Sequence, residues 1–433
     1  MDYLKKFIKK IFQYEARLVL KKYKPKIIAI IGSVGKTVSR EVIYLVLSKK
    51  FFVRKNEKSF TAELGVPLTI LGCPAGEITP IQLIKNILLG LKLLLYKNKY
   101  PDWLILEIDG DKPGDISIVN SFLSIDILVM TVIGSVPSHV EAFYDVDEFL
   151  LEEKTIINKV KRNGVIIYNT DDTQVSNLLL GTDLRKVSCG TDIGSSVRGS
   201  DYKIFYSGDK KTSIPAGMFF EIISKQEVHQ VTIIGSVGIH NEYASLLTFA
   251  VGLEFKIDAK EICTSLCKYK NLPGRMSLIP GVKDTMIIDD SYNASPVAIL
   301  QAVSAFEKIK SRGKKIAVLG DMLELGKYSA EEHRKLAGLL KDKVSNVICV
   351  GLRTQKLGEE LVDIGFNQSN IISVASSEEA GKELQRILEA GDIVLIKGSQ
   401  AMRMEKIVEE VMRHPEDKEK LLVRQEKEWL SRE

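Results

Sequence analysis

The sequence contains only five cysteines, and none of them form a CxxC pair. Cys263 and Cys267 stand one helical turn apart in a segment with helical periodicity, so free thiols in a reducing compartment are predicted rather than a disulfide framework or a zinc site. The N-terminus has lysines among its apolar residues and no small-residue cleavage site, which argues against a signal peptide. We therefore expect a cytoplasmic protein. We also expect it to be a monomer.

Low-complexity and fibrous segments are also missing. Hydrophobic residues make up 45% and charged residues 27% of the 433 positions, which is typical of a soluble globular protein. A chain of this length is too long for a single core, so two or three domains are expected.

The excess of positive charge is confined to one end of the chain. Residues 1–26 hold eight Lys and one Arg against Asp2 and Glu15, whereas the whole chain has a net charge of only +5. Nucleic-acid binding needs a basic surface on the folded body, so no nucleic-acid partner is predicted.

Two segments have the pattern of amphipathic helices. Residues 1–26 place Leu4, Ile8, Ile11 and Phe12 at helical spacing with lysines between them. Residues 81–96 carry a second apolar stripe that is too short and too often interrupted to span a bilayer. Two interpretations stay open: the stripes pack on the protein's own core, or they rest on an anionic membrane surface, giving peripheral membrane contact.

The rest of the chain predicts an α/β fold. Apolar strands at 103–109, 126–134 and 164–169 alternate with helical stretches, as in a parallel sheet, and 195–235 predicts a small antiparallel addition. We expect a basic helix at 1–26, a central P-loop-type parallel-sheet ATPase domain at 27–272, a Rossmann-like C-terminal domain at 273–412 after a hinge at 272–276, and an exposed charged tail at 413–433.

A phosphate-binding loop is predicted between the first strand and the following helix. Its residues are Gly32, Ser33, Gly35, Lys36 and Thr37. Lys36 supplies a charge for the β- and γ-phosphates, and the Thr37 hydroxyl is a hard ligand for Mg²⁺. The pattern is GxxGKT, because isoleucine stands where the usual consensus has its first glycine. ATP binding is predicted, and generic P-loop ATPases are disfavoured.

Further motifs resemble those of the Mur ligases. They are ELGVPLTIL (63–71), LEIDGDKPGDI (106–116), SHVEAF (138–143), GIHNEYA (238–244), LPGRM (272–276), IDDSYNASP (288–296), GDMLELG (320–326) and KGSQAMRME (397–405). The resemblance covers the chain from about residue 26 to 412. It implies an ATP- and Mg²⁺-dependent ligase that joins D-alanyl-D-alanine to a UDP-N-acetylmuramoyl-tripeptide through an acyl phosphate in cell-wall peptidoglycan synthesis.

The resemblance also implies a set of metal ligands and catalytic residues. Glu107, after a strand, is expected to bind Mg²⁺ with Thr37, and His139 to bind a second Mg²⁺. Lys154 falls where these ligases carry a carbamylated lysine that holds the second metal. Lys36, His139 and Lys154 are thus the expected catalytic residues. The plainer interpretations are a capping carboxylate at Glu107 and a surface lysine at 154.

Nucleotide and substrate residues follow in the same way. His240 and Asn241 are expected at the base, Arg275 at the ATP phosphates and Asp290 at the ribose. The expected contacts to the two joined substrates come from Thr61, Asn293 and His333. His333 is otherwise interpreted as a surface histidine.

Two departures from the family pattern affect the substrate assignment. Only residues 1–26 precede the phosphate loop's strand, where these ligases carry a UDP-binding domain, and SFTAELGVPLT (59–69) replaces the usual asparagine-rich turn. The alternatives are a related ligase with another carboxylate substrate, such as a folylpolyglutamate-type substrate, or a catalytically silent nucleotide-binding protein held at a membrane.

Overall fold

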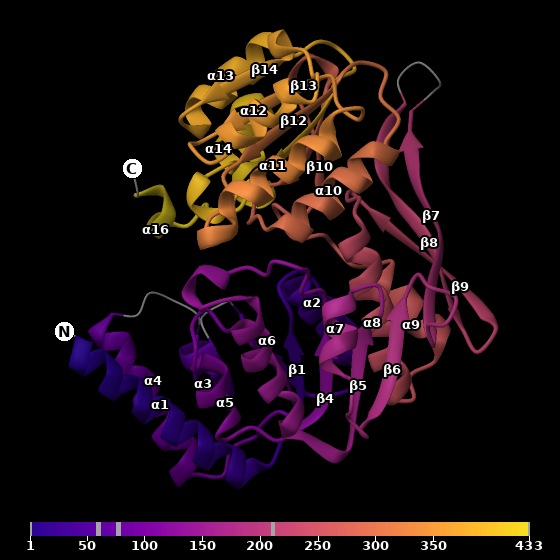
Figure 1. Ribbon diagram of the computed structural model, residues 1–433. Helices are drawn as coiled ribbons and strands as arrows, with labels where there is room; N and C mark the ends of the chain where they lie inside the picture. The colour runs from indigo at the N-terminus through magenta and orange to yellow at the C-terminus, as the bar shows by residue number, and fades with distance from the viewer. Residues whose placement is uncertain (1, 58–61, 75–78, 209–212, 432–433) are drawn as a thin grey trace.

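The computed structural model describes residues 2–57, 62–74, 79–208 and 213–431, which form two α/β lobes (Figure 1). The lower lobe in Figure 1 holds the described chain up to about residue 266. The upper lobe holds the orange and yellow C-terminal part. The predicted α/β class is confirmed.

The lower lobe is built on a nine-stranded sheet in the order β2-β3-β1-β4-β5-β6-β7-β8-β9. Its first six strands pair in parallel: β1 (Lys26–Ile31), β2 (Val53–Lys55), β3 (Trp103–Glu107), β4 (Ile125–Met130), β5 (Val160–Asn169) and β6 (Arg185–Gly190). The antiparallel addition is formed by β7 (Val197–Ser207), β8 (Ile214–Ser224) and β9 (Glu227–Ile234), as the alternating runs predicted.

Helices cover both faces of the parallel part of this sheet, so its central strands β1, β3 and β4 are mostly apolar. In β1, Ile28 and Ile30 face a core shared with α2 (Lys36–Leu47), α8 (Ile239–Glu254) and α9 (Ala259–Leu266). Ile27, Ala29 and Ile31 face the other core, against α3 (Ala62–Leu71), α5 (Asp115–Asn120), α6 (Val146–Thr155) and α7 (Thr173–Leu178). Because its side chains alternate between these two cores, β1 is held between the two layers of helices, and this holds the position at which the strand ends.

The upper lobe has a six-stranded sheet in the order β10-β11-β15-β12-β13-β14. Only β10 (Ser277–Pro280) is antiparallel; β11 (Met286–Asp290), β12 (Lys315–Gly320), β13 (Asn346–Val350), β14 (Ile371–Val374) and β15 (Ile393–Lys397) run in parallel. Its helices are α10 (Pro296–Lys308), α11 (Ser329–Leu340), α12 (Gln355–Asp363), α13 (Ser377–Ile387) and α14 (Glu405–Val411). The expected hinge at 272–276 links α9 to β10.

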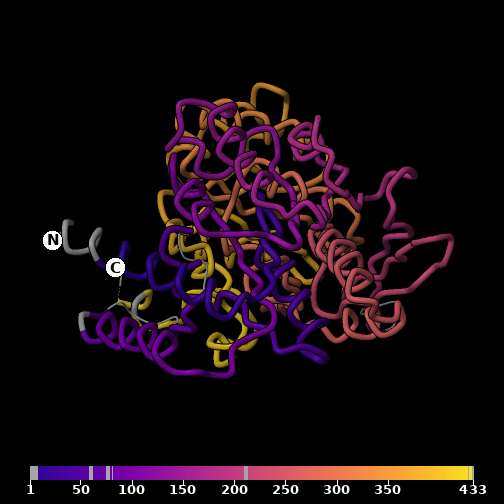
Figure 2. Tube along the Cα trace, turned by 90° about the horizontal axis from the view of Figure 1, so that it is seen from below, coloured from indigo at the N-terminus to yellow at the C-terminus, as the bar shows by residue number. Residues whose placement is uncertain are grey.

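Two helices at one edge of the lower lobe account for the amphipathic segments (Figures 1 and 2). α1 (Asp2–Tyr23) packs against α3 and α4 (Pro80–Leu95). Lys22 of α1 donates to the carbonyls of Leu93 at 2.8 Å and Leu94 at 2.9 Å, which caps the end of α4. No helix in the described ranges is long and apolar enough to cross a membrane.

The C-terminal tail differs from the expectation of a wholly exposed segment. Leu422 and Arg424 are buried between the short helices α15 (Lys418–Leu421) and α16 (Lys427–Leu430). Their burial was not predicted because more than half of residues 413–433 are charged. The tail therefore packs on the upper lobe.

The predicted thiol state agrees with the structure. All five cysteines, each within the described ranges, are free, and Cys267 alone among them is exposed. Burial raises the pKa of the Cys263 thiol to about 12, so it is unreactive near neutral pH.

Candidate active site

The loop between β1 and α2 is held in a conformation that depends on glycine. Gly32 has φ 125° and Gly35 has φ 92°, and a side chain at Gly32 would come within 2.3 Å of the Thr131 hydroxyl. The N–H groups of Ser33 and Val34 donate to the Val132 carbonyl at 2.7 and 2.9 Å. Those two donors are therefore engaged, and the N-terminus of α2 is left as the main backbone anion site.

Lys36 is buried at the base of this loop, beside the carbonyl of Gly32. Its ammonium lies 3.2 Å from a carboxylate oxygen of Asp109. Burial opposes the charged form, but Asp109, Glu107 and Glu153 outweigh it and raise the pKa of Lys36. The lysine is therefore a permanent cation where the loop would hold phosphate.

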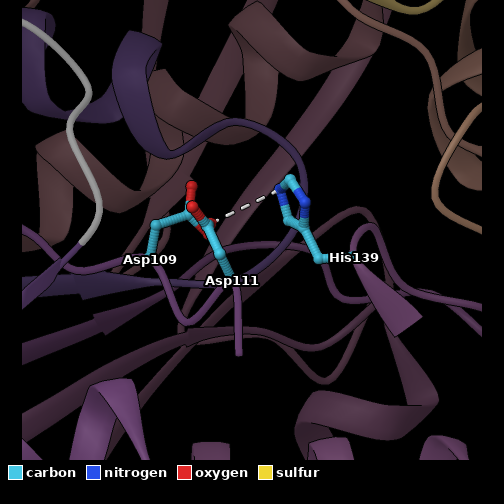
Figure 3. A group of neighbouring side chains, drawn as sticks. All are labelled: Asp109, Asp111 and His139. Atoms are coloured by element: carbon cyan, nitrogen blue, oxygen red, sulfur yellow. Dashed lines mark ion pairs between the residues drawn. The ribbon is translucent and has the colours of Figure 1, made fainter. Parts of the chain in front are cut away.

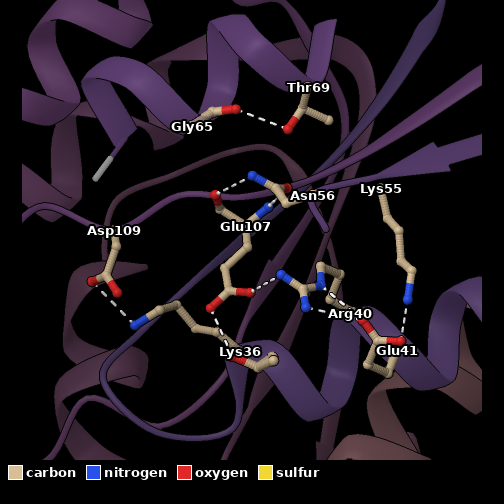
Figure 4. A network of polar contacts seen from close by, with 10 residues as sticks. Lys36, Arg40, Glu41, Lys55, Asn56, Gly65, Thr69, Glu107 and Asp109 are labelled. Atoms are coloured by element: carbon tan, nitrogen blue, oxygen red, sulfur yellow. Dashed lines mark hydrogen bonds and ion pairs between the residues drawn. The ribbon is translucent and has the colours of Figure 1, made fainter. Parts of the chain in front are cut away.

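Thr37 and Glu107 meet as expected. Arg40 is a third residue in this group and also contacts Glu107 (Figure 4). The Thr37 hydroxyl donates to Glu107 at 2.9 Å, and Arg40 donates to the other carboxylate oxygen at 2.7 Å. The Asn56 side chain accepts from the Glu107 N–H at 2.8 Å. Glu107 is thus held in place and its charge is balanced by Arg40, a contact that the sequence gave no reason to expect.

His139 lies in a cluster with Asp109 and Asp111, whose candidate ligand atoms all lie within 4.8 Å of one another (Figure 3). The imidazole is 3.7 Å from Asp111 and 2.6 Å from Glu324 of the upper lobe. Burial disfavours the imidazolium, but the Glu324 hydrogen bond and the two aspartates outweigh it and raise the pKa of His139. The two aspartates were missed by sequence reasoning, although LEIDGD places acids directly after a strand.

The residues of this cluster fit a hard divalent cation. Two carboxylates supply the oxygen ligands that Mg²⁺ prefers, and an imidazole is acceptable beside them. Asp109 also contacts Lys36, so such a cation would lie next to the phosphate loop. The second metal site expected around His139 stays a prediction, and Asp109 and Asp111 would be its other ligands in place of Lys154.

The prediction for Lys154 is not supported, because its side chain is exposed on α6. The adjacent residue, Glu153, is turned inward instead and is only 2% exposed. Burial and, secondarily, Asp109 raise the pKa of Glu153 to about 8, while the charge of Lys36 opposes the rise. Successive helical residues differ in direction by about 100°, so a helix cannot present both to the site.

The opposite wall of the pocket comes from the upper lobe. Arg275 stacks on the Tyr292 ring, with its guanidinium carbon 3.8 Å from the ring centre. Asp290 pairs with the buried Lys397 at 2.6 Å and accepts from the Met276 N–H at 3.1 Å. The same pocket is lined by Lys36, Thr37, Glu107, His139, Arg275 and Asp290. These predicted residues therefore share one cleft, to which sequence reasoning did not assign Lys397.

His240 and Asn241 diverge at the start of α8. His240 lines the pocket, and burial lowers the pKa of its imidazole to about 4, so it is neutral near pH 7. Asn241 is only 1% exposed and donates to Ser236 at 2.9 Å, behind the pocket wall. The predicted contact of Asn241 with a nucleotide base is therefore not supported in this conformation.

The three expected substrate residues have different outcomes. Thr61 lies outside the described residues. Asn293 lines the pocket, and its carbonyl accepts from Lys397 at 2.8 Å. His333 is fully buried; its Nε2 accepts from the Met322 N–H at 3.0 Å and its Nδ1 faces the Ser329 carbonyl at 2.7 Å. It is therefore neither a surface histidine nor a substrate contact, but a support of the GDMLELG loop.

That loop also joins the two lobes. The carbonyl of Glu324 accepts from the Glu141 N–H at 3.1 Å, beside the Glu324–His139 contact. Lys327 donates to the Tyr144 carbonyl at 3.0 Å. The upper lobe thus contacts the lower lobe at the side of the cation cluster.

Comparison with known proteins identifies the class. Residues 30–251 match the model of the Mur ligase middle domain, and residues 274–400 match that of the Mur ligase, glutamate ligase domain. Together with the cleft between two α/β lobes, these matches define an ATP-dependent ligase that joins a carboxylate to an amine. Because the middle-domain match alone covers more than half of the chain, the protein belongs to the Mur ligase family.

Individual relatives agree with this assignment. The UDP-N-acetylmuramoyl-tripeptide–D-alanyl-D-alanine ligase of Bacillus subtilis is 27% identical over 93% of this chain and 79% of that protein. Its counterpart from Mycobacterium leprae is 25% identical over 87% and 71% of the two chains.

Solved structures share the fold. The MurF ligase of Thermotoga maritima in complex with ADP has a TM-score of 0.74 at 23% identity, covering 93% of this chain and 83% of that one. A folylpolyglutamate synthase of Mycobacterium tuberculosis has a TM-score of 0.63 at 13% identity, covering 92% and 95%.

Proposed function

We propose that this protein joins D-alanyl-D-alanine to a UDP-N-acetylmuramoyl-tripeptide at the expense of ATP. The observation that carries the proposal is the cleft in which Lys36 and Thr37 of one lobe face Arg275 and Asp290 of the other. The substrates are proposed from the relatives, because the Bacillus subtilis protein with this activity matches 93% of the chain.

The reaction needs activation because a free carboxylate does not react with an amine at neutral pH. The carboxylate oxygen attacks the terminal phosphorus of ATP, the bond to ADP breaks, and an acyl phosphate forms. The amine of D-alanyl-D-alanine then attacks the acyl carbon, phosphate leaves with the bonding electrons, and the nitrogen loses a proton. No nucleophilic side chain is required.

The residues of the cleft position charge for these steps. Lys36 and Arg275 stand on opposite walls and balance the negative charge of the phosphates from two sides. Mg²⁺ near Thr37, Glu107 and the Asp109–Asp111–His139 cluster would neutralise phosphate charge. The contact between Glu324 and His139 keeps the lobes together on the cluster side, which restricts water that would hydrolyse an acyl phosphate.

A phosphate-release assay tests the proposal. Purified protein receives ATP, Mg²⁺, UDP-N-acetylmuramoyl-tripeptide and D-alanyl-D-alanine. The tripeptide substrate and D-alanyl-D-alanine, the two acceptors, are then omitted in turn. Phosphate release that requires both acceptors, with one new amide detected by mass spectrometry, supports the assignment. ATP binding without turnover would instead identify a silent nucleotide-binding protein. Turnover with a folate polyglutamate and glutamate, but not with the peptide, would identify the folylpolyglutamate-type alternative.

We also propose that the edge formed by α1 and α4 rests on an anionic lipid surface. Part of the α4 stripe packs on the core, including Ile87 and Leu94. The other side is exposed: Ile84 at 60%, Leu88 at 58% and Leu95 at 75%. An exposed apolar stripe that runs from Ile84 to Leu95 without packing on another part of the described chain is unusual on a monomer.

Positive charge accompanies the stripe. Lys85 and Lys92 are exposed along α4. On the adjacent α1, Lys10 and Lys21 are also exposed, whereas Arg17 donates to the Ser121 carbonyl at 3.0 Å, beside α5. Basic helices with an exposed apolar face bind lipid by burying that face beside anionic headgroups.

Flotation with liposomes tests this second proposal. Replacing Leu88 and Leu91 by Gln is expected to abolish flotation with phosphatidylserine liposomes, because the apolar contact is lost. Replacing Lys85 and Lys92 by Gln should weaken binding about fivefold per charge, since each basic residue contributes about 1 kcal/mol near such a surface. Leu352→Gln, at another exposed site in the upper lobe, is the control and should change nothing. Equal binding by the wild type and the Leu88/Leu91 variant would refute the proposal.

A further inference from the structure

The direction in which Glu153 points is fixed by the contacts of α6. Asp145 caps the helix by accepting from the Glu148 N–H at 2.9 Å, and Phe149 is buried in the core. One carboxylate oxygen of Glu152 accepts from the N–H groups of Gly114, Ile116 and Ser117 at 3.1, 3.0 and 3.1 Å, at the start of α5. The helix cannot rotate without losing these bonds.

The same contacts set Glu153 and Lys154 on different sides. Glu153 lies one turn after Phe149, so it shares the buried side of α6. The Thr155 hydroxyl accepts from Asn120 at 2.7 Å, which ties the end of the helix to α5. Lys154 consequently remains exposed, and bringing it inward would require α6 to turn by about 100°.

Glu153 has an incomplete set of partners. One of its carboxylate oxygens is buried and has no hydrogen-bond partner among the described residues. Glu153 interacts electrostatically with Lys36 and Asp109, although it is not one of the three residues whose candidate ligand atoms lie within 4.8 Å of one another. A buried carboxylate is costly unless a cation and hydrogen bonds compensate it, and Lys36 is already shared with Asp109.

The structure assigns Glu153 as the buried acidic group beside the cation site formed by Asp109, Asp111 and His139, and we propose that it supplies a carboxylate there when a divalent cation is bound. A glutamate is anionic in the presence of a divalent cation without any modification. The site is then complete without a carbamylated Lys154 and does not depend on carbon dioxide. This inference rests on the proposed ligase function, because that function supplies the nucleotide that binds together with the cation. Its own test measures metal binding and not ligation.

The test measures Mn²⁺ binding in place of Mg²⁺. Electron paramagnetic resonance counts free Mn²⁺ during titration of the full-length protein with a non-hydrolysable ATP analogue, without any peptide substrate. Glu153→Gln keeps the shape of the side chain. It is expected to lower the affinity for one equivalent of Mn²⁺ at least tenfold. Lys154→Gln, the adjacent position on the same helix, is the matched control and should bind as the wild type does. Glu153→Asp should retain part of the affinity.

Bicarbonate provides the second readout. Mn²⁺ binding should be the same in degassed buffer and in buffer with added bicarbonate, and ¹³C-bicarbonate should give no lysine carbamate signal by NMR. Loss of the Mn²⁺ equivalent in Lys154→Gln, or bicarbonate-dependent binding, would overturn the assignment. Unchanged binding in a folded Glu153→Gln variant would reduce Glu153 to a counter-ion of Lys36. None of these outcomes depends on which carboxylate the enzyme uses.

Discussion

Replacing Lys36 by methionine is expected to lower the rate of phosphate release about a thousandfold at saturating ATP. Methionine preserves the length and packing of the side chain but removes the buried cation between the Gly32 carbonyl and Asp109. Removing one preorganised group that stabilises transition-state charge costs a factor of about 10² to 10³. Lys36 is the only cation of the phosphate loop itself, so the upper end of that range is expected.

The effect should appear mainly in kcat. The N-terminus of α2 and Arg275 remain to bind nucleotide, so ADP affinity, measured by calorimetry, should change much less than turnover. Lys50→Met is the control, because Lys50 forms an exposed pair with Glu261, and such pairs contribute little. A Lys36→Met enzyme that retains a tenth of the wild-type rate would contradict this role.

Much of the fold could be predicted because local sequence patterns and tertiary structure agree. The apolar runs at 103–109 and 164–169 contain β3 and most of β5, and the alternating runs at 195–235 became β7, β8 and β9. Lys36, Thr37 and Glu107 were predictable as a group because a glycine loop and the ends of neighbouring parallel strands meet at one edge of a sheet.

Other site residues could not be predicted because long-range contacts decide them. The choice between Glu153 and Lys154 depends on the rotation of α6, which is set by the contacts of Glu152 with α5. His333 is surrounded by the charged sequence AEEHRK, yet it is buried because its ring completes the hydrogen bonds of the loop at Met322. A resemblance identifies the region of such residues but not the direction of each side chain.

The C-terminal tail, residues 413–433, is another case in which long-range contacts decide the structure and could not be predicted. Arg424 donates to Glu405 at 2.7 Å and to the Ser291 carbonyl at 3.2 Å, and it also contacts the carbonyl of Tyr292. Val423 lies close to Gly274 at the expected hinge. A segment that composition described as a charged end thus supports the loop on which Arg275 stacks.

Replacing Arg424 by alanine is therefore expected to destabilise the upper lobe by about 2–3 kcal/mol, because Glu405 loses one of its two arginine partners and keeps Arg403. The free energy of unfolding, measured by urea denaturation, should fall by this amount. The KM for ATP should also rise, since Tyr292 loses a contact that holds it against Arg275. Addition of saturating ADP should recover part of the lost stability, because binding favours the ordered loop.

Arg413→Ala is the matched control for this prediction, since Arg413 belongs to the same tail but pairs with Asp284 at the surface. Its effect on unfolding should stay within about 1 kcal/mol. If Arg424→Ala were as mild as Arg413→Ala, the tail would be only a surface segment. If it lowered stability but left the KM for ATP unchanged, the tail would brace the lobe without positioning Tyr292, and the two measurements together separate these roles.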